Sequence, residues 1–149
     1  MPKRAVYPNP LFPGGVSVLV PAWDCGWTIE AIAEKDVPKG VPYKIIDTVD
    51  LPQERTFRNA WETDPSKYGE NGVKHVTIHL GKAKEIGHGF RREKRAEEFA
   101  PLDPIASIPG PKGVAAEAAR QAIRDKYDAI QVQIDAATTP EEIKAALGI

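Results

Sequence analysis

Three histidines are the residues whose type and spacing come closest to metal chemistry. His75 and His79 lie four residues apart, and His88 follows nine residues after His79. Imidazole nitrogens suit zinc, copper, iron and nickel, but no carboxylate stands at a recognisable ligand spacing from this set. His75 and His79 also share one face of an expected strand, where two solvent-facing histidines are the simpler interpretation. We therefore expect no metal site.

A basic cluster at residues 91–95 (Arg-Arg-Glu-Lys-Arg) is the second candidate, because clustered cations could hold phosphates. Acidic residues are interleaved with it at Glu85, Glu93, Glu97 and Glu98. Charges of both signs at helical spacing are typical of a solvated face with ion pairs between successive turns. The alternative that stays open is contact with the acidic surface of another protein.

The other residue types form no catalytic pattern. The glycines within 14–15 and 87–89 match no phosphate-binding loop, and no serine lies in a nucleophile elbow. Cys25 is the only cysteine, which excludes an internal disulfide and a cysteine-based zinc site. We expect it to be a small buried or half-buried residue. We expect no cofactor and no enzymatic activity; a metal-dependent or nucleic-acid-processing enzyme is the least favoured hypothesis.

Residues 55–62 (Arg-Thr-Phe-Arg-Asn-Ala-Trp-Glu) combine arginines and aromatic side chains, the types that anchor protein interfaces. The functional interpretation is a docking epitope formed by Arg55, Phe57, Arg58 and Trp61. The structural interpretation is that the two aromatic rings are buried and the arginines pair with nearby acids such as Asp47, Asp50 or Glu54. We expect the structural interpretation, with this stretch acting as a hinge between a β-rich part and a helical part.

Length and charge limit the class of protein. The chain has 149 residues and a net charge of −1, enough for one modest domain or a small domain with an appendage. Such a balanced charge gives no general attraction to nucleic acid or to an anionic membrane. No apolar run approaches the ~20 residues that span a bilayer, and no signal peptide is visible. We expect a protein of a reducing aqueous compartment.

The first half of the chain has the pattern of a small β unit. Residues 1–15 contain several prolines, which predict an extended arm that is neither a helix nor a central strand. Strands are expected near 16–20, 43–47 and 73–80, the last forming a hairpin with residues near Trp61. A short helix is expected to begin after an N-terminal cap at Thr28 and to stop before Pro38.

The second half has helical periodicity. Helices are expected near 82–99, 114–137 and 140–147, the last opened by a capping box at residues 139–142. Their narrow apolar stripes must pack on each other, on the β unit or on another subunit. The class is therefore α+β, with an N-terminal β-rich domain over 1–80 and a helical region over 81–149. The interface candidates in the helical region are Phe90, Arg91, Arg95, Ile123, Tyr127, Ile130 and Ile134.

Several short phrases carry a resemblance to a known group of proteins. Residues 55–62, preceded by Asp-Leu-Pro at 50–52, resemble a phrase in small uncharacterised proteins encoded among the structural genes of tailed bacteriophages. The segments at 14–18, 82–86 and 138–143 are similar to the same pattern, as are 102–103 and the Ala pair at 136–137. The chain departs from the pattern at His88, which stands between two glycines.

The resemblance implies a role in the virion or the tail locus. Our first hypothesis is a virion structural protein, as a minor tail, tail-fibre-anchoring or head–tail component, made in the host cytoplasm. The alternative is a non-virion chaperone for tail or tail-fibre assembly. The expected partners are other phage structural proteins, with homo-oligomerisation inside an assembly and without a membrane or sequence-specific nucleic acid. The resemblance assigns no functional residue.

Overall fold

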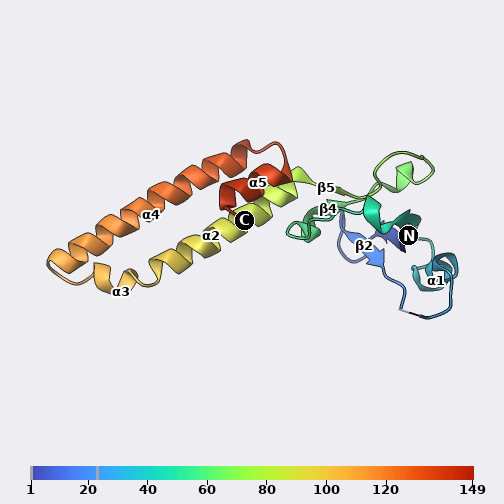
Figure 1. Ribbon diagram of the computed structural model, residues 1–149, viewed down its shortest axis with the longest axis horizontal. Helices are drawn as coiled ribbons and strands as arrows, with labels where there is room; N and C mark the ends of the chain where they lie inside the picture. Colours follow the sequence, from blue (N-terminus) through green and yellow to red (C-terminus); the bar gives the residue numbers. More distant parts are fainter. Residues whose placement is uncertain (1, 23) are drawn as a thin grey trace. The chain divides into compact units, whose positions relative to one another are not determined.

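The computed structural model describes residues 2–22 and 24–149, and the chain divides into two compact units between His79 and Leu80. All the β-strands lie in the N-terminal unit, and the C-terminal unit is helical (Figure 1). The expected α+β class, with a small antiparallel sheet followed by a helical half, is confirmed.

A three-stranded antiparallel sheet in the order β2-β1-β3 organises the N-terminal unit. Ala5 in the central strand lies opposite Leu19 on one side and Ile45 on the other. The strands are β1 (Lys3–Pro8), β2 (Val16–Leu19) and β3 (Lys44–Asp47). The two strands expected near 16–20 and 43–47 are therefore confirmed.

The expectation of a proline-rich arm over residues 1–15 is wrong, because β1 is the central strand of the sheet. The prolines do not interrupt it: Pro2 precedes the strand and Pro8 is its last residue. Pro2 even contributes its carbonyl oxygen, which accepts a hydrogen bond from the Thr48 amide at 3.0 Å. Proline blocks a central strand only where a ladder amide is needed, and no proline falls in residues 3–7.

Helix α1 (Ile29–Asp36) covers one face of the sheet. Thr28 caps it, since its hydroxyl oxygen accepts a hydrogen bond from the Ala31 amide at 3.2 Å. The cap and the end of the helix before Pro38 both match the sequence-based expectation. The buried residues on this side of the sheet are Ala5, Ile29, Ala33 and Val37.

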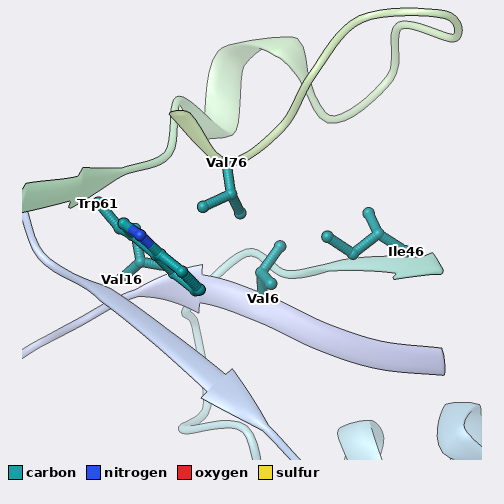
Figure 2. Close-up of a cluster of buried hydrophobic side chains, with 5 residues drawn as sticks. All are labelled: Val6, Val16, Ile46, Trp61 and Val76. Carbon is teal, nitrogen blue, oxygen red and sulfur yellow. The ribbon is translucent and has the colours of Figure 1, made fainter. Parts of the chain in front are cut away.

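The opposite face of the sheet carries the second core cluster (Figure 2). Val76 and the ring of Trp61 point onto the strands that carry the other three members of the cluster. Side chains alternate between the two faces of a strand, so Val6 belongs to this cluster and its neighbour Ala5 to the other. The cluster consists of Val6, Val16, Ile46, Trp61 and Val76.

Trp61 is held over the sheet by a short hairpin. Strand β4 (Trp61–Glu62) pairs with β5 (Thr77–Ile78), with Trp61 opposite Ile78. The expected hairpin is confirmed, but the strand expected over 73–80 is shortened to two residues. Its partner β4 is equally short, and helix α2 already begins at Leu80.

Residues 80–149, all of which the structure describes, form four helices. The long helices α2 and α4 run side by side in opposite directions, and α5 packs against both (Figure 1). The short α3 lies between the helices expected near 82–99 and 114–137, where no helix was expected. The bounds are α2 (Leu80–Phe99), α3 (Asp103–Ala106), α4 (Pro111–Ala136) and α5 (Pro140–Leu147). Of the described helices, none combines the length and apolar character needed to cross a bilayer.

Two glycines allow close approaches in the C-terminal unit. Gly87 is buried in α2 where Ile143 of α5 packs, and a Cβ at Gly87 would lie 2.6 Å from Cγ2 of Ile143. Gly113, in the first turn of α4, lies against the backbone carbonyl of Ile108, where a Cβ would overlap it. Both positions therefore exclude a side chain in this packing.

Candidate protein-interaction site

The loop between β1 and β2 is closed by hydrogen bonds that start from Asn9. The Asn9 amide donates to the Gly15 carbonyl at 3.0 Å, and the Gly15 amide donates to the Phe12 carbonyl at 2.9 Å. The side-chain Oδ1 of Asn9 accepts from the amides of Leu11 and Phe12, at 2.9 and 3.3 Å. An Asn side chain that bonds its following backbone in this way orders a turn.

This ordered loop displays two large apolar side chains. Leu11 is 81% exposed and Phe12 is 69% exposed. Single exposed apolar residues are common on protein surfaces, but adjacent ones on a hydrogen-bonded turn form a fixed projection. We refer to these two residues as the Leu11–Phe12 tip. It offers apolar area to a partner without a large loss of loop entropy.

A groove of about 530 Å³ lies at the end of the sheet on the face that Trp61 covers. Three arginines line it, and no carboxylate is found among the described residues that line it. We call it the arginine groove. Its lining consists of Arg4, Val18, Val20, Thr48, Leu51, Pro52, Gln53, Arg55, Arg58 and Trp61.

The sheet and its covering segment each supply part of the groove. Arg4 stands two residues before Val6 in β1, so it shares the face of the second core cluster. Val18 lies in β2 and Val20 directly follows this strand, while Thr48 directly follows β3. Residues 51–61 supply the other wall. Because β1 is central, its arginine lies between the ends of both neighbouring strands.

Two contacts fix the position of Arg58 in the groove. Its Nη2 donates to the Val16 carbonyl at 3.0 Å, and its Cζ lies 4.4 Å from the Trp61 ring centroid. Burial lowers the pKa of Arg58, and the nearby positive charge of Arg55 lowers it further. Two guanidinium groups that raise each other's free energy favour the arrival of an anion.

The prediction for residues 55–62 is confirmed in one part and corrected in another. Phe57 is fully buried and Trp61 is 3% exposed, as expected. Arg58, however, contacts a carbonyl and a ring rather than Asp47, and Asp47 pairs with Lys3 at 3.3 Å. The stretch also lies inside the N-terminal unit, so it is not a hinge at the boundary, which falls after residue 79.

The basic cluster of α2 is only partly a solvated face. Arg91 is 7% exposed, which corrects the expectation for this residue, whereas Arg92 is exposed and Arg95 is half-buried. Burial, followed by the charges of Arg95 and Arg92, lowers the pKa of Arg91. Its Nε donates to Nδ1 of His88 at 3.3 Å, and Nε2 of His88 lies 2.8 Å from Oδ1 of Asp135. Arg91 therefore helps to join α2 to α4.

The apolar side chains along one face of α4 pack inside the C-terminal unit. Tyr127 is 3% exposed and Ile134 is fully buried, while Ile123 and Ile130 are half-buried. Burial raises the pKa of Tyr127, and the phenol also bonds Glu98 of α2. Within this unit the helices pack on each other, which is one of the packing partners expected from the sequence. Tyr127 and Ile134 are thus not surface contacts, and Phe90 in α2 is half-buried.

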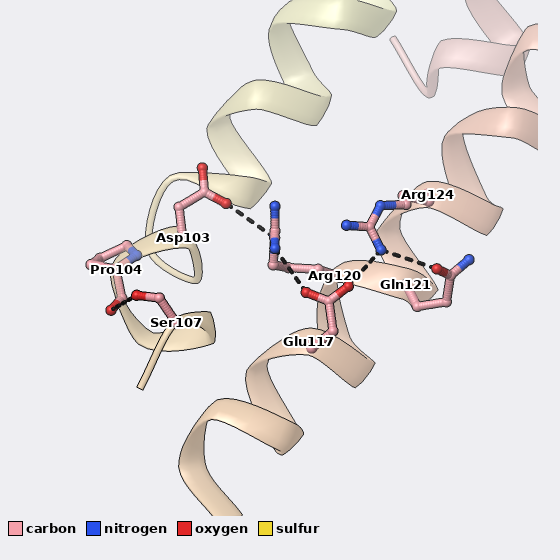
Figure 3. Close-up of polar contacts among 7 residues, drawn as sticks. All are labelled: Asp103, Pro104, Ser107, Glu117, Arg120, Gln121 and Arg124. Atoms are coloured by element: carbon pink, nitrogen blue, oxygen red, sulfur yellow. Dashed lines mark hydrogen bonds and ion pairs between the residues drawn. The ribbon is translucent and has the colours of Figure 1, made fainter. Parts of the chain in front are cut away.

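A polar network holds the turn between α3 and α4 (Figure 3). Nε of Arg120 lies 3.1 Å from Oδ1 of Asp103, and its Nη1 donates to Glu117 at 2.7 Å. Arg124 reaches the other oxygen of Glu117 at 2.8 Å. Both guanidinium groups also lie over the Phe99 ring, 5.6 and 5.9 Å from its centroid. This cluster is a structural support for the helical hairpin.

The three histidines are not gathered into one site. His75 packs edge-on against Tyr68, His79 is exposed beyond β5, and His88 bonds Asp135 within the helical unit. Across residues 2–22 and 24–149, no cluster of three or more His, Cys, Asp or Glu side chains could hold a metal ion. Cys25 is exposed, so the expectation of a buried cysteine is wrong.

Sequence reasoning missed Arg4, Leu11 and Phe12. All three lie in the segment interpreted as an arm, so neither the groove nor the tip was expected. The available signal was a Pro- and Gly-rich run between two apolar segments, which is a pattern of a hairpin loop. Comparison with known proteins adds no guidance, since no family model, curated protein or solved structure matches the chain.

Proposed function

We propose that this chain is a virion structural protein of a tailed bacteriophage, acting through protein–protein contacts as a minor tail, tail-fibre-anchoring or head–tail component. The observation that carries the contact-based role is the Leu11–Phe12 tip, which is held by hydrogen bonds and exposed to solvent. The phage setting is supported only by the resemblance of residues 55–62 and the accompanying phrases.

The energetics of the tip favour its use as an anchor. Burying one large apolar side chain is worth about 1.5–3 kcal/mol, and an ordered turn loses little entropy on binding. The area that two side chains can bury is far smaller than that of a standard interface, which buries about 800 Å² on each partner. The tip therefore serves as an anchor within a wider contact, as interface anchors usually do.

The alternative is an assembly chaperone that covers a tail or tail-fibre protein and then leaves. A transient client could use the same exposed tip, so the two roles differ in persistence rather than in chemistry. A structural component stays in the finished particle at a fixed copy number. A chaperone co-purifies with one client and is absent from finished particles.

Mass spectrometry of purified particles tests the proposal. We expect the chain at a constant ratio to the other structural proteins; its absence from particles that assemble normally would contradict a virion role and favour the chaperone. A Leu11→Ser, Phe12→Ser double variant is expected to lose incorporation. Val49→Ser is the matched control, because Val49 is also exposed (58%) in the same unit but lies outside the tip and the groove. Equal incorporation of both variants would exclude the tip as the anchor.

A further inference from the structure

Strand β2 is an outer strand whose outer edge pairs with no other strand among the described residues and borders the arginine groove. The sheet order β2-β1-β3 gives β2 a sheet neighbour on one side only. Two of the groove residues, Val18 and Val20, belong to β2 or follow it directly. An open strand edge is a template for a further strand, which is a common way of binding an extended peptide.

The register identifies which backbone groups face this edge. The Asn9 amide bonds the Gly15 carbonyl, so the ladder bonds of this antiparallel pair continue at alternate positions, through Ser17 and Leu19 of β2. The amides and carbonyls of Val16 and Val18 consequently point away from β1. The hydrogen bond from Arg58 to the Val16 carbonyl is consistent with this alternation, because it shows that this carbonyl points away from β1. Val18 thus presents its donor and its acceptor beside the groove.

The side chains around this edge favour an added strand that carries negative charge. Arg4, Arg55 and Arg58 surround an apolar floor that includes Val18, Val20, Leu51 and Trp61. Arginine presents a planar fork of donors that matches a carboxylate. Nη2 of Arg58 already donates a hydrogen bond to the Val16 carbonyl. Arg55 is exposed, so it is the arginine best placed to donate hydrogen bonds to a carboxylate.

We propose that the arginine groove binds an extended acidic segment of a partner polypeptide, which adds as a strand to β2 and places carboxylates on the arginines. A nucleic acid would satisfy the positive charges but would leave the Val18 amide and carbonyl without the regular strand pairing that a peptide supplies. The chemistry of the groove is independent of the phage setting and of the Leu11–Phe12 tip.

The test uses the full chain and a fluorescein-labelled peptide of about eight residues that alternates valine and glutamate, long enough to follow the edge of a strand. Fluorescence anisotropy is expected to show saturable binding that weakens with salt. A valine–lysine peptide is expected not to bind. The valine–glutamate peptide with every interior amide N-methylated keeps the charge and loses the backbone donors, so it is also expected not to bind.

Protein variants locate the site. Arg55→Gln is expected to weaken binding about ten-fold, as the loss of a charge-assisted contact does. Lys39→Gln is the matched control: it removes one exposed cation from the same unit, outside the groove, and is expected to bind like the wild type. Arg4→Gln is the second groove variant, and circular dichroism confirms that each variant is folded. Wild-type affinity in both groove variants would overturn the proposal.

Competition distinguishes the other sources of negative charge. Undiminished binding of the N-methylated peptide, or displacement of the acidic peptide by inorganic phosphate alone, would show a simple anion site and overturn strand addition. Tighter, competitive binding of oligodeoxythymidylate would assign the groove to single-stranded nucleic acid instead. Resistance to both competitors, with loss of binding on N-methylation, supports the added strand.

Discussion

Ile143 of α5 occupies the space where Gly87 of α2 would otherwise carry a side chain. A Cβ on Gly87 would lie 2.6 Å from Cγ2 of Ile143 and 3.7 Å from Cγ2 of Ile134. Both isoleucines are fully buried, so neither can turn out to solvent. The glycine, which weakens α2 as a helix, is what lets the last helix pack directly against its backbone.

Gly87→Ala is therefore expected to destabilise the C-terminal unit. Alanine improves helix propensity by ~1 kcal/mol, but overpacking a full core costs about 1–3 kcal/mol, so the net loss is about 1 kcal/mol. Gly89→Ala is the matched control in the same helix, because no atom beyond the local helix backbone lies within 4 Å of its Cβ position. We expect it to raise the melting temperature; thermal unfolding followed by far-UV circular dichroism measures both. A stabilised Gly87→Ala variant would contradict this packing.

Arg91→Ala is expected to lower the free energy of unfolding by about 1–3 kcal/mol, because it removes a buried side chain and leaves Nδ1 of His88 without its donor. Arg92→Ala removes the same charge from the next, exposed position and is expected to change stability by less than ~0.5 kcal/mol. Urea titration compares the two variants. Equal losses would mean that Arg91 acts only through its charge.

Glu142 predicts an acid-sensitive start of α5. Its carboxylate accepts a hydrogen bond from the Thr138 amide at 2.6 Å, while the Thr139 hydroxyl accepts from the Glu142 amide at 3.2 Å. The backbone and hydroxyl bonds from Thr138 hold the pKa of Glu142 below its ordinary value of 4.5. A carboxylate whose pKa is lower in the folded state than in the unfolded state stabilises the fold at a pH above the unfolded pKa. This stabilisation is lost as the pH falls below 4.5 and through the folded pKa.

The corresponding test is thermal unfolding across this acidic range. Glu142→Gln is expected to be less stable than the wild type at neutral pH and to lose less stability on acidification. Glu141→Gln is the neighbouring control, and its pH profile is expected to follow that of the wild type. A Glu142→Gln profile parallel to the wild-type profile would show that the carboxylate does not act as the cap.

Asn9→Ala is expected to loosen the Leu11–Phe12 tip without unfolding the sheet. The variant loses the oxygen that accepts from the amides of Leu11 and Phe12, and a lost turn or cap bond of this kind costs about 1 kcal/mol locally. Limited digestion with chymotrypsin is expected to cut after Leu11 faster than in the wild type, because the bond after Phe12 is protected by the proline that follows it. Val49→Ser again serves as the control. Unchanged cleavage would mean that the prolines alone hold the loop.

The regular elements were predictable where one local signal agreed with the packing. The capping residues Thr28 and Thr139 begin helices as expected, and the stripe through Tyr127 and Ile134 faces inward. β1 was not predictable in this way, because prolines recur along residues 2–13 and the sequence does not show which of these positions the sheet needs as amide donors. Only the positions of Pro2 and Pro8 relative to the ladder decide whether a strand tolerates them.

The candidate site was less predictable than the fold. Residue type alone indicates Arg58 and Trp61, but the groove is also lined by Arg4, which β1 brings close from far away in the sequence. Arg91 shows the opposite failure: charge patterning suggested a solvated residue, and contact between helices buries it. The positions of Arg4 and Arg91 both depend on contacts between elements that are distant in the sequence. Helical spacing and composition carry no information about such contacts.

The central position of β1 has a consequence for how the N-terminal unit folds. β2 follows β1 after one short loop, whereas β3 follows only after α1 and its connections. Closing the longer loop costs more chain entropy, so the β1–β2 hairpin is the first part of the sheet to form, on the ~1–10 μs timescale of hairpins. We therefore expect the arrival of β3 to be the slower step. Changes in the chain between residues 20 and 43 are then expected to alter the folding rate more than changes in the turn that carries Leu11 and Phe12.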